Sequence, residues 1–415
     1  MTRIGIYTTF SKIDPAYSLC SVVLDQLTAF TKHGHKPVLF VLPSFNDEDL
    51  VPKGVEIRKV VPQLILEPYK GLGVPDHWKN DVLQVKEYAE KNLADITHLI
   101  CHDIFFIDTF LPYNIGLRDA LPQLPELRIF AWTHSAPSPR PSLENNPHAS
   151  RYSLNSDRIK LVYLNHDKVT ALAEMYGAWD NDVRVVRNAR DPRTFWPLHP
   201  LVVSIIDRYE LFEADFINIY PLSTPRMISG KGLDKVIRLH AGLKKLGYKT
   251  KLIVCNAHAN AAPEQRLIAE TRVWAAGLDI GHKELIFTSQ EGEEYRQGVP
   301  QTTVSDFFRL SNLFVFPTVS ENSSLVLLEA MLSSNLLVLN KEVGTLKEHA
   351  GETALYFDFG YKESEDDTNA YFLDLAKIVV AQFEISKPLQ AKRKALKEFN
   401  YDILYRNLEN LCYEN

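Results

Sequence analysis

The chain has 415 residues, a length that accommodates two or three domains of ordinary size. Apolar residues make up 45% of it and charged residues 24%, as in a globular protein, and the net charge of −6 gives no sign of a surface made for nucleic acid or membranes. Four cysteines lie scattered without paired spacing, which argues against a zinc site or a disulfide framework: Cys20, Cys101, Cys255 and Cys412. Because the amino terminus opens directly as a strand and no apolar segment reaches the length of a transmembrane helix, we expect a cytoplasmic protein with no transmembrane segment.

The first half of the chain alternates short apolar runs with segments of helical periodicity. Strands are predicted at 4–9, 37–42, 55–61, 96–102, 127–132, 162–165 and 183–186, and helices at 19–32 and 81–92. The opening strand, helix and strand form a βαβ unit, which is the building block of a doubly wound parallel sheet. We therefore expect a parallel sheet with helices on both faces.

Three histidines stand where these strands should end: His102, His134 and His166. A histidine at a strand end is more often structural than functional. Before His134, the apolar residues 130–132 fit a buried strand that delivers one polar tip. A segment rich in proline, serine and asparagine follows at 136–157, and it is either a solvated loop or a flap that binds a substrate.

The second half begins after a predicted linker at 197–200 and again alternates strands with helices. Strands are predicted at 216–220, 252–256, 285–288 and 313–316, and helices at 305–310 and 323–332. Lysines and arginine at 387–397 predict a helix whose basic face is either solvated or, less commonly, in contact with nucleic acid or a membrane. A last helix is predicted at 399–412.

Two carboxylates interrupt the apolar segment around 323–332. Glu321 stands at the start of the predicted helix and Glu329 about two turns into it, where nearly every direction is apolar, so we expect the helix to be buried. An ionised carboxylate there is costly unless hydrogen-bond donors surround it. Either a basic side chain or backbone amide supplies these donors, or a polyhydroxyl ligand does. The strand–loop–helix context favours a ligand, because open α/β sheets bind ligands at the carboxyl ends of their strands.

Two basic residues precede another predicted helix that begins near residue 233. Arg226 and Lys231 would provide a forked donor and a compact point charge close to the amides of the helix terminus, which together suit a diphosphate. The alternative is that both side chains are simply solvated in a loop.

The sequence FPTVSENSSLVLLEAM resembles the E-x7-E signature of retaining glycosyltransferases of family 4, in a bacterial or bacteriophage member. The resemblance implies that Glu321 lies beside the donor sugar and that Glu329 binds the ribose hydroxyls of the nucleotide. It also implies that the residues that start the helix, Ser323, Ser324 and Leu325, line the donor site.

Further residues match the same pattern outside this motif. Arg226 and Lys231 keep the spacing of the family's diphosphate-binding pair, and His134 corresponds to a histidine that contacts the donor sugar. The resemblance thus implies four catalytic residues: His134, Arg226, Lys231 and Glu321. His102 and Asp103 become candidates for the acceptor side.

The fold implied by the resemblance is α/β with GT-B architecture, in which two Rossmann-like doubly wound parallel-sheet domains face a cleft. Residues 1–197 would form the acceptor-side domain and residues 198–395 the nucleotide-sugar donor domain. Residues 396–415 would form a helix that crosses back to the first domain.

The implied activity is transfer of a sugar, with retention, from a UDP- or GDP-linked donor to a hydroxyl acceptor, which is a glycan, a lipid or a small molecule. The family needs no metal and no further cofactor. Two alternatives stay open. One is a DNA glycosyltransferase that acts on a hydroxylated base, so that nucleic acid would be bound only as the acceptor. The other is a catalytically silent nucleotide-sugar binding protein, because Pro225 and Ser324 replace glycines of the family and the first loop, 8–15, lacks glycine.

Overall fold

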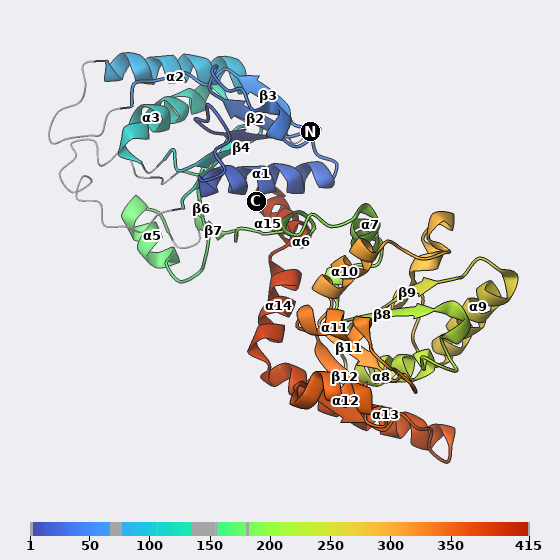
Figure 1. The fold of residues 1–415 in the computed structure, drawn as a ribbon. Helices are drawn as coiled ribbons and strands as arrows, with labels where there is room; N and C mark the ends of the chain where they lie inside the picture. The colour runs from blue at the N-terminus through green and yellow to red at the C-terminus, as the bar shows by residue number, and fades with distance from the viewer. Residues whose placement is uncertain are drawn as a thin grey trace. The chain divides into compact units, whose positions relative to one another are not determined.

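The computed structural model describes residues 3–66, 77–105, 107–134, 154, 156–179 and 182–413. The chain forms two compact units, which are described separately: Met1–Arg190 together with Phe399–Asn415, and Asp191–Glu398 (Figure 1). The division thus falls between Arg190 and Asp191, whereas the sequence placed it between 197 and 198. Most of the predicted loop at 136–157 lies outside the described residues.

The first unit contains a seven-stranded, wholly parallel sheet in the order β3-β2-β1-β4-β5-β6-β7. Its strands are β1 (Ile4–Tyr7), β2 (Val38–Val41), β3 (Glu56–Lys59), β4 (His98–His102), β5 (Arg128–Trp132), β6 (Ile159–Tyr163) and β7 (Val183–Val185). Its helices are α1 (Ser18–Lys32), α2 (Trp78–Asn92), α3 (Leu111–Ala120), α5 (Val169–Tyr176) and α15 (Tyr401–Tyr413), with short 3-10 turns η1 (Glu48–Leu50), η2 (Asp108–Phe110) and η3 (Leu121–Gln123).

Both faces of this sheet are covered, because alternate residues of its strands enter different cores. In β1, Ile6 packs in a cluster with side chains of α1 and α15, whereas Tyr7 packs in a second cluster with side chains of α2 and α3. A strand that is buried on both faces is apolar throughout, which is why β1 and β2 appear in the sequence as continuous apolar runs.

The second unit contains a six-stranded parallel sheet in the order β10-β9-β8-β11-β12-β13. Its strands are β8 (Phe216–Ser223), β9 (Thr250–Ala257), β10 (Leu285–Phe287), β11 (Leu313–Phe316), β12 (Leu336–Asn340) and β13 (Ala354–Phe357). Its helices are α6 (Pro192–Phe195), α7 (Pro200–Arg208), α8 (Leu233–Lys245), α9 (Ala262–Gly277), α10 (Gln301–Leu310), α11 (Leu325–Leu332), α12 (Gly344–Ala350), α13 (Glu365–Ile385) and α14 (Lys387–Glu398). Short 3-10 turns are η6 (Leu211–Glu213), η7 (Thr224–Arg226), η8 (Thr288–Gln290), η9 (Glu293–Tyr295) and η10 (Gly351–Thr353).

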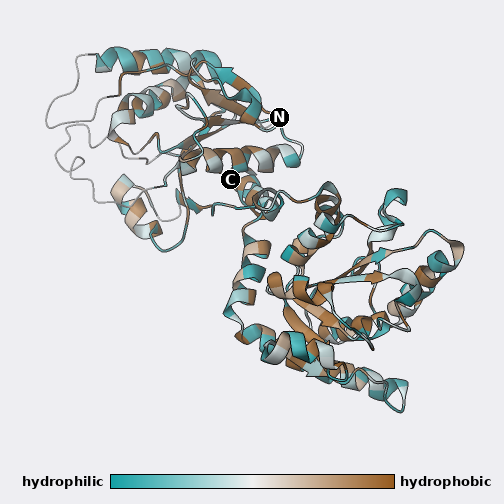
Figure 2. Ribbon diagram, viewed as in Figure 1, coloured by the Kyte–Doolittle hydropathy of each residue, from teal (hydrophilic) through white to brown (hydrophobic). Residues whose placement is uncertain are grey.

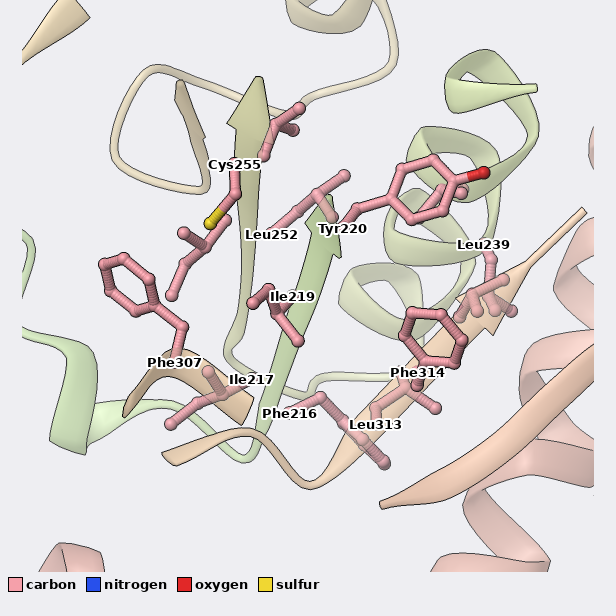
Figure 3. Close-up of a cluster of buried hydrophobic side chains, with 14 of the residues drawn as sticks. Phe216, Ile217, Ile219, Tyr220, Leu239, Leu252, Cys255, Phe307, Leu313 and Phe314 are labelled. Atoms are coloured by element: carbon pink, nitrogen blue, oxygen red, sulfur yellow. The ribbon is translucent and has the colours of Figure 1, made fainter. Parts of the chain in front are cut away.

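The centre of this unit is a single apolar core built on β8, β9 and β11. Figure 3 shows Ile219 of β8 and Leu252 of β9 among it, with Phe314 of β11 and Phe307 of α10 on neighbouring elements. Figure 2 shows the same feature as apolar colour concentrated along the strands of each unit. The strands are thus fixed mainly by apolar burial, although β8 and β9 also bury polar residues such as Asn218 and Asn256.

The predicted fold class, two Rossmann-like doubly wound parallel-sheet domains, is confirmed by the strand orders. In each sheet the first strand along the chain lies in the interior, and the following strands are added first on one side and then on the other. The four cysteines are free and buried, as expected from their spacing. Among the described helices, none combines the length and the apolar character needed to cross a membrane.

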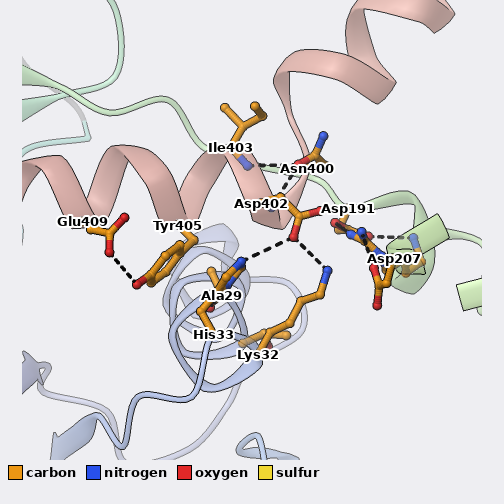
Figure 4. Close-up of polar contacts among 12 residues, drawn as sticks. Ala29, Lys32, His33, Asp191, Asp207, Asn400, Asp402, Ile403, Tyr405 and Glu409 are labelled. Atoms are coloured by element: carbon orange, nitrogen blue, oxygen red, sulfur yellow. Dashed lines mark hydrogen bonds and ion pairs between the residues drawn. The ribbon is translucent and has the colours of Figure 1, made fainter. Parts of the chain in front are cut away.

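Helix α15 belongs to the first unit and packs on α1 (Figure 4). Its start is capped by the side chain of Asn400, which accepts hydrogen bonds from the backbone N–H groups of Asp402 and Ile403 at 2.9 and 3.0 Å. Lys32 then pairs with Asp402 at 2.8 Å, and the ring of His33 stacks on Tyr405 with centroids 3.8 Å apart. The end of the chain is therefore held by polar and aromatic contacts in addition to apolar ones.

Two local expectations are wrong. The residues predicted as a linker at 197–200 include Pro200, which starts α7. The basic helix face at 387–397 is in large part internally bound, because Lys392 Nζ donates to the Ser311 carbonyl and Lys397 Nζ lies 2.7 Å from Asp215. Burial lowers the pKa of Lys392 to about 8, which a solvated lysine would not show.

Candidate active site

The second sheet changes direction of winding between β8 and β11, which are neighbours in the sheet. Loops that leave the carboxyl ends of two such strands diverge to opposite faces, and ligands of open α/β sheets bind in the space between them. The loop after β8 carries Arg226 and Lys231, and the loop after β11 carries Glu321. Three predicted site residues from distant parts of the sequence therefore reach one edge of this sheet.

Lys231 and Glu321 form an ion pair between Nζ and Oε1, with side chains that are 17% and 15% exposed. The ammonium also lies 5.2 Å from the centre of the Phe316 ring, at the end of β11. Tyr220 of β8 donates its hydroxyl to the Lys231 carbonyl, and Thr345 Oγ1 donates to the Glu321 carbonyl at 2.6 Å. Both charged residues are thus held through their backbones by the strands and helix around them.

Gly232 allows the Lys231 loop to pass close to the end of β11. Its φ is +66°, in the left-handed region, and a Cβ placed on it would lie 3.3 Å from Pro317 Cγ. A larger residue would be strained in this conformation and crowded by the proline. Gly232 is also the residue before α8, so the same glycine brings Lys231 to the start of that helix.

Arg226 is held by its backbone and leaves its side chain available. Its carbonyl accepts from the N–H groups of Gly230 and Lys231 at 3.1 and 2.9 Å, and its guanidinium lies over Gly230. The side chain is exposed, and the described residues form no hydrogen bond or ion pair with its guanidinium. An arginine in this state presents a forked donor to an anion from outside.

The start of α11 differs in part from what the sequence predicted. The helix begins at Leu325, and Ser324 is its N-cap, with Oγ accepting from the Leu327 N–H at 3.2 Å. Ser324 is buried and its hydroxyl is used in this cap, whereas Ser323 and Leu325 are exposed. The expectation that the helix is buried in nearly every direction is wrong, because only Leu327 and Ala330 are buried.

Glu329 has an environment of its own on α11. It accepts a hydrogen bond from Gln301 Nε2, and partial burial raises the pKa of its carboxyl group. It lines a pocket of about 510 Å³ together with Trp196, Ser305, Phe308, Arg309, Leu332, Ser333, Ser334 and Lys392. Among the described contacts, none joins Glu329 to Glu321, Lys231 or Arg226, so the two glutamates of the motif serve different surroundings.

The remaining predicted residues gather at the carboxyl edge of the sheet in the first unit. His102 Nδ1 lies 3.0 Å from His134 Nε2, and Asp103 Oδ1 accepts from the His134 N–H at 3.0 Å. Asp103 has a φ of +57°, which is strained for a residue other than glycine, and its own N–H donates to the Trp132 carbonyl at 2.8 Å. Burial lowers the pKa of His134 to about 4, so its ring is neutral at pH 7.

Gln26 is a member of this group that sequence reasoning missed. Its Oε1 lies 3.0 Å from His102 Nε2, on the side opposite His134. The side chain is 1% exposed and comes from α1, whose other buried residues are mostly apolar. The available signal was a polar residue on the buried face of an amphipathic helix, which requires an internal partner.

No cluster of three or more His, Cys, Asp or Glu side chains placed to hold a metal ion occurs in the described part of the chain. Arg226, Lys231 and Glu321 bring both signs of charge to the switch point of the second unit.

No protein-family model matches the chain, and no curated protein sequence matches it. Solved structures that are similar over nearly the whole length include a glycosyltransferase from Rickettsia africae ESF-5 (13% identity, 100% of this chain and 99% of that chain, TM-score 0.39). They also include an α,α-trehalose-phosphate synthase (UDP-forming) from Burkholderia xenovorans in complex with glucose-6-phosphate (13% identity, 99% and 100%, TM-score 0.37). A third is sucrose-phosphate synthase from Thermosynechococcus elongatus (13% identity, 99% and 98%, TM-score 0.37). At these low identities and TM-scores, we infer nothing about activity from the likeness.

Proposed function

We propose that this chain is a retaining GT-B glycosyltransferase of the family 4 type, which moves a sugar from a UDP- or GDP-linked donor to a hydroxyl acceptor. The observation that carries the proposal is the charge arrangement at the β8–β11 switch point. There the Lys231–Glu321 ion pair and the guanidinium of Arg226 lie where an open sheet binds its ligand.

The basic pair suits the leaving group of such a reaction. When the bond to the anomeric carbon breaks, negative charge develops on the diphosphate, and fixed positive groups at that position lower the barrier. Lys231 would act as a point charge and Arg226 as a forked donor. We propose that these two side chains, without a metal ion, neutralise the diphosphate, so that a chelator should leave the activity unchanged.

The ion pair places an opposite charge beside a largely buried lysine before the donor binds. Glu321 compensates the ammonium in the free protein. A diphosphate that takes over Lys231 would release the carboxylate of Glu321. That carboxylate would then hold the donor sugar and stabilise positive charge at the anomeric carbon, while attack occurs on the face that the diphosphate leaves.

Glu329 is proposed to bind the ribose. Its carboxylate is partly desolvated and accepts a hydrogen bond from an amide in the free protein. Ribose hydroxyls are donors of the kind that such a carboxylate needs. His134 is proposed to contact the donor sugar, and Asp103 supports it by accepting from its backbone N–H.

Calorimetric titration tests the donor site. Wild-type protein would be titrated with UDP, GDP, ADP and CMP, alongside Glu329→Ala, Lys231→Ala and the control Glu363→Ala, which changes an exposed carboxylate of the same unit. We expect one nucleoside diphosphate to bind, and each of the first two variants to weaken it roughly 10- to 100-fold, as for loss of a hydrogen bond to a charged group. If Glu329→Ala binds the nucleotide as tightly as Glu363→Ala, Glu329 does not contact the nucleotide.

Hydrolysis of the donor distinguishes an enzyme from a silent nucleotide-sugar binding protein. We expect slow release of the nucleotide from the donor in water, lost in Glu321→Ala. Binding without hydrolysis in any condition, together with no transfer to a hydroxyl acceptor, would favour the silent protein.

An acceptor in DNA is the less supported alternative. Lys392 and Lys397 of α14 are committed to internal partners, which removes much of the basic surface that motivated it. Steeply salt-dependent binding of duplex DNA would restore that alternative.

A further inference from the structure

A chain of hydrogen bonds runs from α1 through β4 to the residue two positions after β5. It begins at Gln26 Oε1, which lies 3.0 Å from His102 Nε2. It continues from His102 Nδ1 to His134 Nε2, also at 3.0 Å. Gln26 and His102 are 1% and 3% exposed, so water does not reach these bonds easily.

The positions of the protons in this chain follow from counting donors. Burial lowers the pKa of His134 to about 4, and burial together with His134 lowers the pKa of His102 well below its usual value, so both rings are neutral at pH 7. A neutral imidazole carries one N–H and one lone pair. Because the amide oxygen of Gln26 can only accept, His102 must carry its proton on Nε2. Its Nδ1 then accepts from His134, whose proton must also be on Nε2.

The remaining nitrogen of His134 is therefore defined. Nδ1 holds the lone pair, and no described residue donates to it. The backbone of His134 is fixed by Asp103, and its ring lies 6.5 Å from the Trp132 ring at an interplanar angle of 16°. The ring thus has one protonated nitrogen turned to the interior and one acceptor nitrogen left for a ligand.

We propose that Gln26 and His102 are positioning residues that lock His134 in the Nε2-protonated tautomer, so that His134 offers Nδ1 as a hydrogen-bond acceptor to a substrate hydroxyl. The locking of the tautomer stands on the geometry of the first unit alone. The identity of the hydroxyl as that of a donor sugar rests on the proposed function. His102, which the sequence suggested as an acceptor-side residue, acts here through His134 and does not need to touch a substrate.

The amide of Gln26 sets the direction of the whole chain. If its nitrogen faced His102, every donor and acceptor would be reversed, and His134 would carry its proton on Nδ1. The tautomer of His134 therefore reports on the amide of a residue two hydrogen bonds away. A histidine held only by packing would show no such dependence.

The test is nitrogen NMR of the full-length protein, labelled with 15N-histidine and without ligand, at about pH 7, where both rings are neutral. Among the 13 histidines, His134 is assigned with His134→Asn. We expect a single tautomer of His134 with the proton on Nε2 in the wild type. In Gln26→Met, which keeps the size of the side chain but removes its strong acceptor, we expect exchange between both tautomers. The control Thr28→Val alters the same helix without touching the chain of bonds and should match the wild type.

A wild-type His134 with its proton on Nδ1, or a tautomer unchanged in Gln26→Met, would overturn the proposal. The wild-type measurement decides the direction even if Gln26→Met does not fold. In the transfer assay, Gln26→Met should lower kcat about three- to tenfold, the effect of one neutral hydrogen bond, and leave nucleotide binding unchanged. A locked tautomer in a protein that binds no nucleotide would contradict the proposed function and leave the positioning of His134 intact.

Discussion

At the residue scale, the same side chain has a different chemistry in each environment that the fold provides. Glu321 pairs with Lys231, whereas Glu329, on the same motif, accepts from an uncharged amide and has a raised pKa. A cation stabilises the ionised carboxylate, and desolvation without a cation disfavours it. Glu321 thus has a cationic partner, whereas Glu329 has only a neutral donor.

Buried histidines make the stability of this protein depend on pH. His240 is fully buried, its Nδ1 lies 2.5 Å from Thr250 Oγ1, and burial lowers its pKa to about 3. Since the pKa is lower in the folded state than in the unfolded state, the unfolded chain binds more protons between these two values. Stability is therefore fully present above the unfolded pKa of about 6.5 and falls as the pH drops below it, by up to about 1.4 kcal/mol per pH unit for each such group.

We expect urea denaturation to show this loss between about pH 7 and about pH 5, and His240→Asn to make the free energy of unfolding less dependent on pH over that range. His282→Asn, at an exposed position, serves as the control and should leave the dependence unchanged. If the free energy of unfolding depends on pH to the same extent in wild type and in His240→Asn, His240 does not contribute to this dependence.

At the element scale, α11 shows how an apolar sequence can form a helix with one buried face. Leu327 is fully buried, whereas Leu325 and Leu332 are 71% and 86% exposed. This helix therefore has more apolar residues than its packing within the second unit buries. Its position is fixed instead by Leu327, by Ala330 and by the cap at Ser324.

Matched substitutions on the buried and the exposed face of α11 test this difference in burial. Leu327→Ala should lower the free energy of unfolding by about 2–5 kcal/mol, because it removes fully buried methyl groups and leaves a cavity. Leu332→Ala should change it by less than about 0.5 kcal/mol, because that side chain is already in solvent. Both variants make the same chemical change in one helix, and denaturation by urea compares them. A similar cost for the two would show that the outer face of α11 is covered in the folded protein.

At the scale of the whole molecule, the chain returns to its first unit at the end. Arg190 N–H donates to the Phe399 carbonyl at 2.8 Å, and Tyr401 donates to the buried Asp25 of α1 at 2.8 Å. Leu404, Leu408 and Leu411 of α15 enter the core of the first unit. The first unit is thus built from both ends of the sequence, with the second unit inserted between them.

Removal of residues 399–415 should therefore destabilise the first unit selectively. Loss of the buried side chains of α15 should cost roughly 5–10 kcal/mol, which is comparable to the stability of a whole domain. We expect hydrogen exchange to show lost protection in α1 and the first sheet, with protection retained in β8 and β11. If the truncated chain does not accumulate, Leu408→Ala can be used in its place. That variant should show the same pattern of lost protection, but more weakly. Uniform loss of protection in both sheets would show that the two units unfold as one.

The sequence alone was enough to predict the two parallel sheets, because alternation of buried strands and amphipathic helices is a local pattern. The resemblance to the glycosyltransferase pattern also assigned Lys231 and Glu321 to one site, although 90 positions separate them, and their ion pair appears only in the structure. Only the tertiary structure decided which face of α11 is buried, that Lys392 is internally bound, and that Gln26 ends the chain of bonds to His134. These features depend on contacts between distant elements, and local periodicity carries no information about which element covers a given face.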